Sequence, residues 1–137
     1  MNILDCIPQR APFIMIDEIT YAEGDTTRTT FAIDPGNIFI TNGHFTAPGL
    51  VENMAQTAGA GTGYRAIKAN KPTPMGYIAA LKNLHVTALP QVSDTITTEA
   101  VFLQTMLNFH LVRGSVQLNG KEIASCEFKI FVTPGKE

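Results

Sequence analysis

The alternation of apolar and polar residues divides the chain into short β-rich runs around one long helical candidate. Residues 12–19 are strongly apolar and are predicted to form a first strand that crosses the core. Residues 26–33 are rich in threonine and β-branched side chains, which is typical of a strand partly open to solvent. Because residues 22–25 carry a turn signal, these two strands predict a hairpin. One helical turn at residues 2–7 precedes them.

Only residues 49–69 predict a long helix. This stretch carries no formal charge between Glu52 and Arg65, and a helix so poor in charge is usually buried over most of its circumference. Gly59, Gly61 and Gly63 each cost on the order of 1 kcal/mol of helix propensity relative to alanine. We expect close packing, ahead of contact with a ligand, to be the reason for these glycines.

The second half of the chain predicts an antiparallel meander. Its β-rich runs cover residues 77–89, 94–104, 108–118 and 122–132. The last two runs are joined by Asn119-Gly120, the strongest short-range hairpin signal. Several strands beside one apolar helix bury the largest apolar area when the sheet curls around the helix. We therefore predict a single α+β domain over residues 1–137, with a curled antiparallel β-sheet wrapped around one long central helix.

Composition narrows the class of protein. A chain of 137 residues with 45% hydrophobic content can build one core. A charged fraction of 16% and a net charge of −2 do not indicate a protein that binds nucleic acid or that is held on a membrane by its charge. Without a secretion signal or a stretch long enough to cross a bilayer, we expect a cytoplasmic location. Cys6 and Cys126 lack metal-type spacing, so we predict neither a metal site nor a disulfide framework.

Candidate chemistry gathers where the helix is predicted to begin. His44 arrives on an extended segment, Pro48 and Gly49 break the chain into a helix start, and Glu52 is expected in the first turn. An imidazole titrates near neutral pH and can serve as a general base. The carboxylate is a candidate acid, although desolvation and the helix dipole act on its protonation in opposite directions. The free N–H of Gly49 can polarise a carbonyl oxygen, as an oxyanion hole does.

The remaining candidates carry weaker signals. His85 and His110 fall in predicted strands far apart in the sequence, so we expect structural or surface roles for both. The cysteines and serines have no neighbouring base motif, which gives covalent catalysis little support.

Residues 7–17, Ile-Pro-Gln-Arg-Ala-Pro-Phe-Ile-Met-Ile-Asp, resemble the Leu-Pro-His-Arg-x-Pro-Phe-Leu-Leu-Val-Asp opening of the β-hydroxyacyl-(acyl carrier protein) dehydratases. The resemblance continues through residues 43–45, through Pro48-Gly49 and through the Glu-x-Met-Ala-Gln motif of residues 52–56, and it spans nearly the whole chain. Residues 54–59 look closer to a divergent branch associated with aryl-polyene and flexirubin-type pigment pathways. These dehydratases have the hot-dog fold.

The resemblance implies a function and assigns roles. The reaction would be dehydration of a 3-hydroxyacyl-(acyl carrier protein) thioester to a trans-2-enoyl thioester, in fatty-acid or polyene-type biosynthesis. His44 matches the catalytic histidine, Glu52 the catalytic acid and Gly49 the N–H donor to the thioester carbonyl. The neighbouring residues expected to contact substrate are Phe45, Pro48 and Gln56.

The resemblance also implies partners. The substrate would arrive on the phosphopantetheine of an acyl carrier protein, and no metal or other cofactor is expected. The histidine and the acid of one site come from different subunits in the family, which implies a homodimer, a higher oligomer of dimers, or a heteromer with a paralogue.

The sequence departs from the family at one place. Only eight positions separate His44 from Glu52, whereas the family has a longer proline-rich loop there. Either the helix starts later and the acid still reaches the site, or the geometry has changed and the reaction is altered or lost. Two rival functions therefore stay open: an acyl thioesterase of the same fold, and a non-catalytic acyl-thioester-binding subunit of a dehydratase heteromer.

Overall fold

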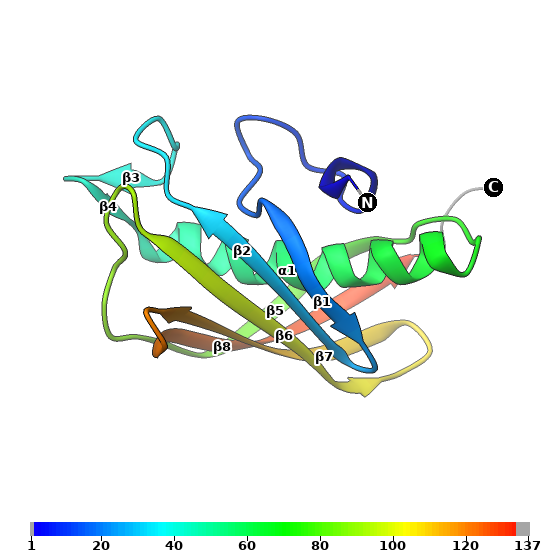
Figure 1. The fold of residues 1–137 in the computed structure, drawn as a ribbon. Helices are drawn as coiled ribbons and strands as arrows, with labels where there is room; N and C mark the ends of the chain where they lie inside the picture. Colours follow the sequence, from blue (N-terminus) through cyan, green and yellow to red (C-terminus); the bar gives the residue numbers. More distant parts are fainter. Residues whose placement is uncertain (1, 134–137) are drawn as a thin grey trace.

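The computed structural model describes residues 2–133 (Figure 1). Its elements in chain order are the 3₁₀ turn η1 (Ile3–Asp5), β1 (Glu18–Glu23), β2 (Thr26–Ala32), β3 (Ile40–Thr41), β4 (His44–Phe45), α1 (Ala47–Lys68), β5 (Met75–Val86), β6 (Thr95–Thr105), β7 (Phe109–Leu118) and β8 (Lys121–Thr133).

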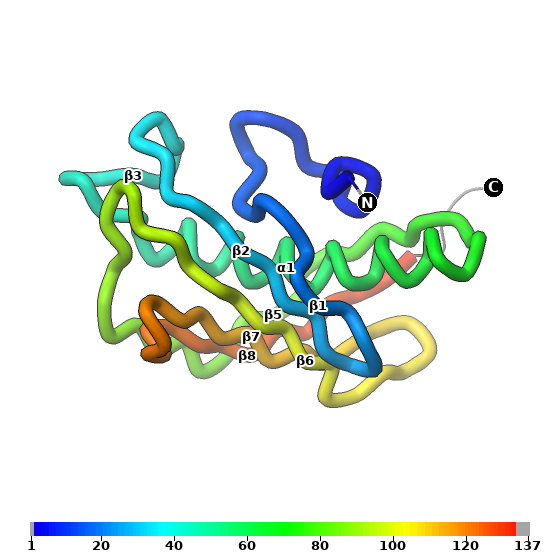
Figure 2. Tube along the Cα trace, in the orientation of Figure 1, coloured from blue at the N-terminus to red at the C-terminus, as the bar shows by residue number. Residues whose placement is uncertain are grey.

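Six strands form one antiparallel sheet in the order β1-β2-β6-β7-β8-β5. Helix α1 runs lengthwise against this sheet, and the small β3–β4 hairpin lies near the N-terminal end of the helix (Figures 1 and 2). The core forms between them from buried side chains of both layers, including Leu50 and Met54 of α1 and Val112 and Phe128 of the sheet. The predicted α+β architecture, a curled sheet around one long helix, is confirmed. No helix in the described part of the chain is long and apolar enough to cross a membrane.

Two hairpins form where turn chemistry predicted them. The β1–β2 pair closes over Gly24, which has a positive φ of 57°. The β7–β8 pair closes over Asn119 and Gly120, with φ of 53° and 80°. Positive φ at both central residues is the signature of a type I′ turn, whose twist matches that of the flanking strands.

The predicted strand over residues 12–19 is wrong for its first six residues, because β1 begins only at residue 18. Side chains of α1 take the backbone groups that a neighbouring strand would have bonded. The Met15 N–H donates to Gln56 Oε1 at 2.7 Å, and Asn53 Nδ2 donates to the Met15 carbonyl at 2.7 Å. Gln56 Nε2 donates to the Phe13 carbonyl at 2.8 Å. Helical amides thus satisfy backbone groups of residues 13 and 15 without a sheet ladder.

The glycines of α1 divide into two kinds. A Cβ added at Gly63 would overlap the carbonyl oxygen of Cys6, and one added at Gly61 would overlap Thr27 Oγ1. Close packing, the expected reason, is confirmed for these two positions. At Gly59 an added Cβ would meet no atom within 4 Å, so packing within the chain does not require glycine there.

Strand β5 lies at an edge of the sheet beside β8, although β6 follows it in the sequence. Most of its residues are exposed in the isolated chain. Large apolar side chains are among them: Met75, Tyr77, Ile78, Leu81 and Leu84. An apolar edge strand whose outer edge has no partner strand is suited to pairing with another chain.

Candidate active site

Helix α1 begins two residues earlier than predicted, with Thr46 as its N-cap. The first intrahelical bond runs from the Leu50 N–H to the Thr46 carbonyl at 3.0 Å. The Gly49 N–H therefore lies before the first intrahelical hydrogen bond and remains available as a donor. Glu52 consequently lies in the second turn of the helix, and the predicted first-turn position is wrong. The helix thus starts earlier, not later, than the sequence predicted.

Gly49 is fixed by aromatic packing. A Cβ at this position would lie 2.6 Å from the ring of Phe45 and 2.9 Å from Phe39 Cβ. Phe45 is fully buried and packs against Phe31 and Phe39, with ring centroids 5.7 and 6.4 Å apart. The side chain of Phe45 thus belongs to the core and supports the backbone that presents the Gly49 N–H. Its contact with substrate stays a prediction.

His44 follows a tight turn between β3 and β4. Asn42 and Gly43 have φ of 52° and 76°, which makes this a second Asn-Gly hairpin turn. His44 Nδ1 lies 3.0 Å from the Asn42 carbonyl oxygen. Because a carbonyl can only accept, Nδ1 carries the hydrogen in this bond, and Nε2 of the neutral ring is left free to take a proton. The Asn42-Gly43 pair is itself a sequence signal for this hairpin.

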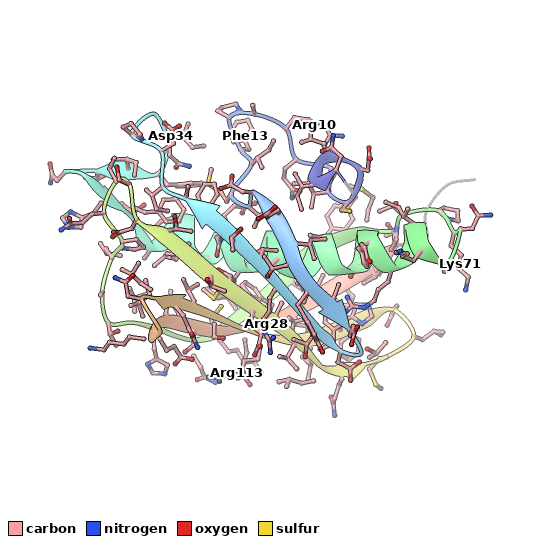
Figure 3. The ribbon with its side chains drawn as sticks, viewed as in Figure 1. Arg10, Phe13, Arg28, Asp34, Lys71 and Arg113 are labelled. Atoms are coloured by element: carbon pink, nitrogen blue, oxygen red, sulfur yellow. The ribbon has the colours of Figure 1, made fainter. Side chains whose placement is uncertain are left out.

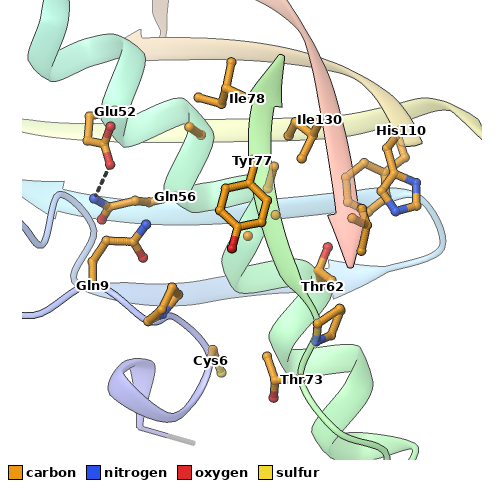
Figure 4. A pocket seen from close by; sticks show the side chains of 18 residues that line it. Cys6, Gln9, Glu52, Gln56, Thr62, Thr73, Tyr77, Ile78, His110 and Ile130 are labelled. Atoms are coloured by element: carbon orange, nitrogen blue, oxygen red, sulfur yellow. Dashed lines mark hydrogen bonds between the residues drawn. The ribbon is translucent and has the colours of Figure 1, made fainter. Parts of the chain in front are cut away.

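A pocket of about 340 Å³ lies between α1, β5 and the N-terminal segment (Figure 4). Glu52, Gln56 and Gly59 line it from the helix, and Tyr77 lines it from β5. His44 is not among the described residues that line this pocket. One chain therefore supplies the predicted acid to the pocket without the predicted base.

Gln56 holds the Glu52 carboxylate in place. Its Nε2 donates to Glu52 Oε1 at 3.0 Å, as the dashed line in Figure 4 shows. Its Oε1 accepts the Met15 N–H, which fixes the orientation of the amide. Gln56 is only 1% exposed, although it lines the pocket, and its amide positions Glu52. Its contact with substrate stays a prediction. Pro48, the other expected contact, lies exposed at the second position of α1.

Two residues that sequence reasoning set aside also line the pocket, Cys6 and His110. Burial raises the pKa of the Cys6 thiol, and it raises that of Cys126 to about 12. Protonated thiols are poor nucleophiles, which agrees with the weak case for covalent catalysis. His110 stacks on Phe102 with ring centroids 5.1 Å apart, and burial lowers the pKa of its imidazole. The alternation of His110 with buried Val112 was the sequence signal that places it on the inner face.

Across residues 2–133, no group of three or more histidine, cysteine, aspartate or glutamate side chains has the arrangement of a metal site.

Solved structures share the architecture. The dehydratase heterocomplex ApeI:P from Xenorhabdus doucetiae matches with a TM-score of 0.90 at 13% identity, covering 99% of this chain and 93% of that one. A hypothetical thioesterase with coenzyme A from Streptococcus pneumoniae matches with a TM-score of 0.69 at 13% identity, covering 88% of each chain. At such identities the likeness establishes the fold alone, and it confirms the predicted hot-dog fold.

Sequence comparisons establish the family. The profile described as "ApeP-like: ApeP dehydratase" matches residues 1–136. The 3-hydroxyacyl-(acyl-carrier-protein) dehydratase FabZ of Methylobacterium nodulans is 28% identical over 137 aligned residues, covering 93% of this chain and 84% of that protein. FabZ of Aeromonas hydrophila is 28% identical over 135, covering 92% of this chain and 88% of that protein. The predicted reaction class, dehydration, is confirmed with the resemblance. The chain belongs to the ApeP-like dehydratase family.

Proposed function

We propose that this chain dehydrates 3-hydroxyacyl thioesters carried on the phosphopantetheine arm of an acyl carrier protein, giving trans-2-enoyl thioesters for fatty-acid or polyene-type biosynthesis. The observation that carries the proposal is the Glu52 carboxyl group, held by Gln56 on the wall of the pocket. The chain would act as one domain spanning residues 1–137, without a metal or other cofactor. Its cytoplasmic location stays a prediction.

Three groups each perform one part of the reaction. His44 Nε2 removes the proton from C2 of the substrate, and the Gly49 N–H stabilises the charge that develops on the thioester oxygen. The electron pair of the broken C2–H bond forms the C2–C3 double bond as the C3–O bond breaks. Glu52 donates a proton to the departing oxygen, which leaves as water. Pro48, beside Gly49 at the helix start, would border the thioester.

Two chains would complete each site. Glu52 lines the pocket and His44 does not, and the family resemblance implies that the two come from different subunits. We therefore propose that His44 of the partner subunit closes the pocket that holds Glu52. The apolar edge strand β5, which also lines the pocket, supports an interface at this place. The heterocomplex among similar structures supports a second form, in which a paralogue takes the partner's place.

A complementation experiment tests the shared site. His44→Ala and Glu52→Gln homodimers should each be inactive, but mixing and reassociating them should restore activity. Random pairing makes half of the dimers mixed, and each mixed dimer has one intact site, so we expect about a quarter of wild-type activity. Turnover is measured after exchange at equal concentrations, with each variant reassociated alone as control. A mixture as inactive as its parents would show that both groups act within one chain.

The reaction itself is tested by product analysis with 3-hydroxyacyl thioesters on a carrier protein. We expect an enoyl thioester and water, with turnover falling by roughly 10²–10⁴-fold in Glu52→Gln because general acid catalysis is lost. Glu122→Gln, on a half-exposed residue remote from the pocket lining, is the matched control. Release of free acid without enoyl thioester would identify a thioesterase instead. Activity that appears only with a paralogue added would assign the chain to a heteromer.

A further inference from the structure

Gln9 carries a buried polar atom that nothing in the described part of the chain satisfies. Its Oε1 is shielded from solvent and has no hydrogen-bond partner among residues 2–133. Gln9 also lines the pocket that holds Glu52 and Gln56. A buried carbonyl oxygen without a donor costs free energy, and such groups in native structures call for an explanation. Because Gln9 lines a pocket, a donor on a bound ligand would satisfy this oxygen.

The segment that carries Gln9 is held rigidly. The Arg10 guanidinium donates from Nη1 to the carbonyl oxygens of Ile7 and Gln9 at 2.8 and 2.7 Å, and from Nη2 to that of Leu4 at 2.9 Å. The backbone of Cys6 packs directly against Gly63 of α1. These contacts fix the backbone of Gln9 before any ligand binds, which reduces the entropy lost on binding.

The neighbouring amide is already committed. Gln56 accepts the Met15 N–H and donates to Glu52 and to the Phe13 carbonyl. Figure 4 shows the Gln9 side chain next to Gln56, on the side of the pocket where Glu52 lies. Gln9 Oε1 is thus an unused acceptor in the wall of the pocket that also holds the proposed acid.

We propose that Gln9 Oε1 accepts a hydrogen bond from the 3-hydroxyl of the substrate and so selects 3-hydroxyacyl chains over saturated ones. The inference rests on the proposed function, because Glu52 must approach this same hydroxyl. The two contacts are complementary: Glu52 donates a proton to the hydroxyl oxygen, while the hydroxyl's own hydrogen needs an acceptor. When the C3–O bond breaks, the oxygen leaves as water with both hydrogens, and Gln9 forms no covalent bond.

A ligand comparison tests the assignment. Gln9→Met keeps the length of the side chain and removes the acceptor. It is made in a His44→Ala background, so that bound 3-hydroxyacyl thioester is not turned over. Calorimetry gives Kd for a 3-hydroxyacyl pantetheine thioester and for the saturated acyl thioester of equal length. We expect Kd for the hydroxylated ligand to rise about tenfold, while Kd for the saturated ligand changes less than about twofold.

Gln117→Met, the same substitution on an exposed residue of β7, is the control and should change neither Kd. Equal weakening of both ligands would overturn the proposal, since it would move the contact to a donor on the pantetheine arm. An unchanged Kd for the hydroxylated ligand would overturn it as well. This outcome can be distinguished from failure of the proposed function. If the native chain has no dehydratase activity but Gln9→Met still weakens binding of the hydroxylated ligand selectively, the chain is a 3-hydroxyacyl-binding subunit.

Discussion

Replacing His44 with alanine is expected to lower the turnover number for dehydration by roughly 10²–10⁴-fold, the usual contribution of a general base. The neutral ring donates from Nδ1 to the Asn42 carbonyl at 3.0 Å, which leaves Nε2 as the only ring nitrogen able to take the C2 proton. The rate is measured by enoyl thioester formation at saturating substrate, because the loss should fall mainly on turnover.

The fold should survive this substitution. His44 is partly exposed, and its backbone pairs with Thr41 across the hairpin whatever its side chain. Thr41→Ala, on the exposed residue directly opposite, is the matched control and should keep wild-type turnover. A His44→Ala enzyme that dehydrates as fast as the wild type would remove His44 from the mechanism and leave the Gly49 N–H and Glu52 without a base.

Substitution of Gly63 with alanine is expected to destabilise the protein by about 1–3 kcal/mol, the cost of an overpacked site. The new Cβ would overlap the carbonyl oxygen of Cys6. Since that oxygen belongs to the backbone, relief requires the N-terminal segment to move away from α1. The free energy of unfolding is measured by urea denaturation with a linear extrapolation.

Gly59→Ala is the matched control and should have the opposite sign. The same change in helix propensity applies, but the added Cβ meets no atom within 4 Å, so we expect a gain of about 0.5–1 kcal/mol. Since Gly59 lines the pocket, turnover should fall even as stability rises. Equal effects of the two substitutions would mean that helix propensity, and not contact with Cys6, decides the role of Gly63.

Several features of this protein follow from short stretches of sequence. The Asn119-Gly120 turn formed as predicted because a type I′ turn needs positive φ at two adjacent residues, which this pair tolerates. The long helix was visible because its charge-free run is local. The motifs that carry the family resemblance, at residues 7–17 and between His44 and Gln56, are likewise short stretches of sequence.

Other features depend on partners distant in the sequence. Residues 12–17 read as a strand by their apolar pattern, yet two amide side chains of α1, Asn53 and Gln56, bond their backbone instead. Nothing within those six residues encodes that competition. The role of Gln56 also depends on a residue distant in the sequence. Its contact with Glu52 lies within the helix, but the Met15 N–H fixes the orientation of its amide.

The sequence by itself thus determined the long helix, the hairpin turns at Gly24 and at Asn119-Gly120, and the fold class, and it supplied the candidate acid and base. Only the tertiary structure decided that β5 crosses to the far edge beside β8, that Glu52 lines the pocket without His44, and that Gln9 lies in the same pocket wall. The physical reason is the distance along the sequence between the residues that decide each feature. Turns and helix ends are set by the conformational preferences of a few adjacent residues, whereas strand order and pocket walls depend on which distant surfaces bury most apolar area together.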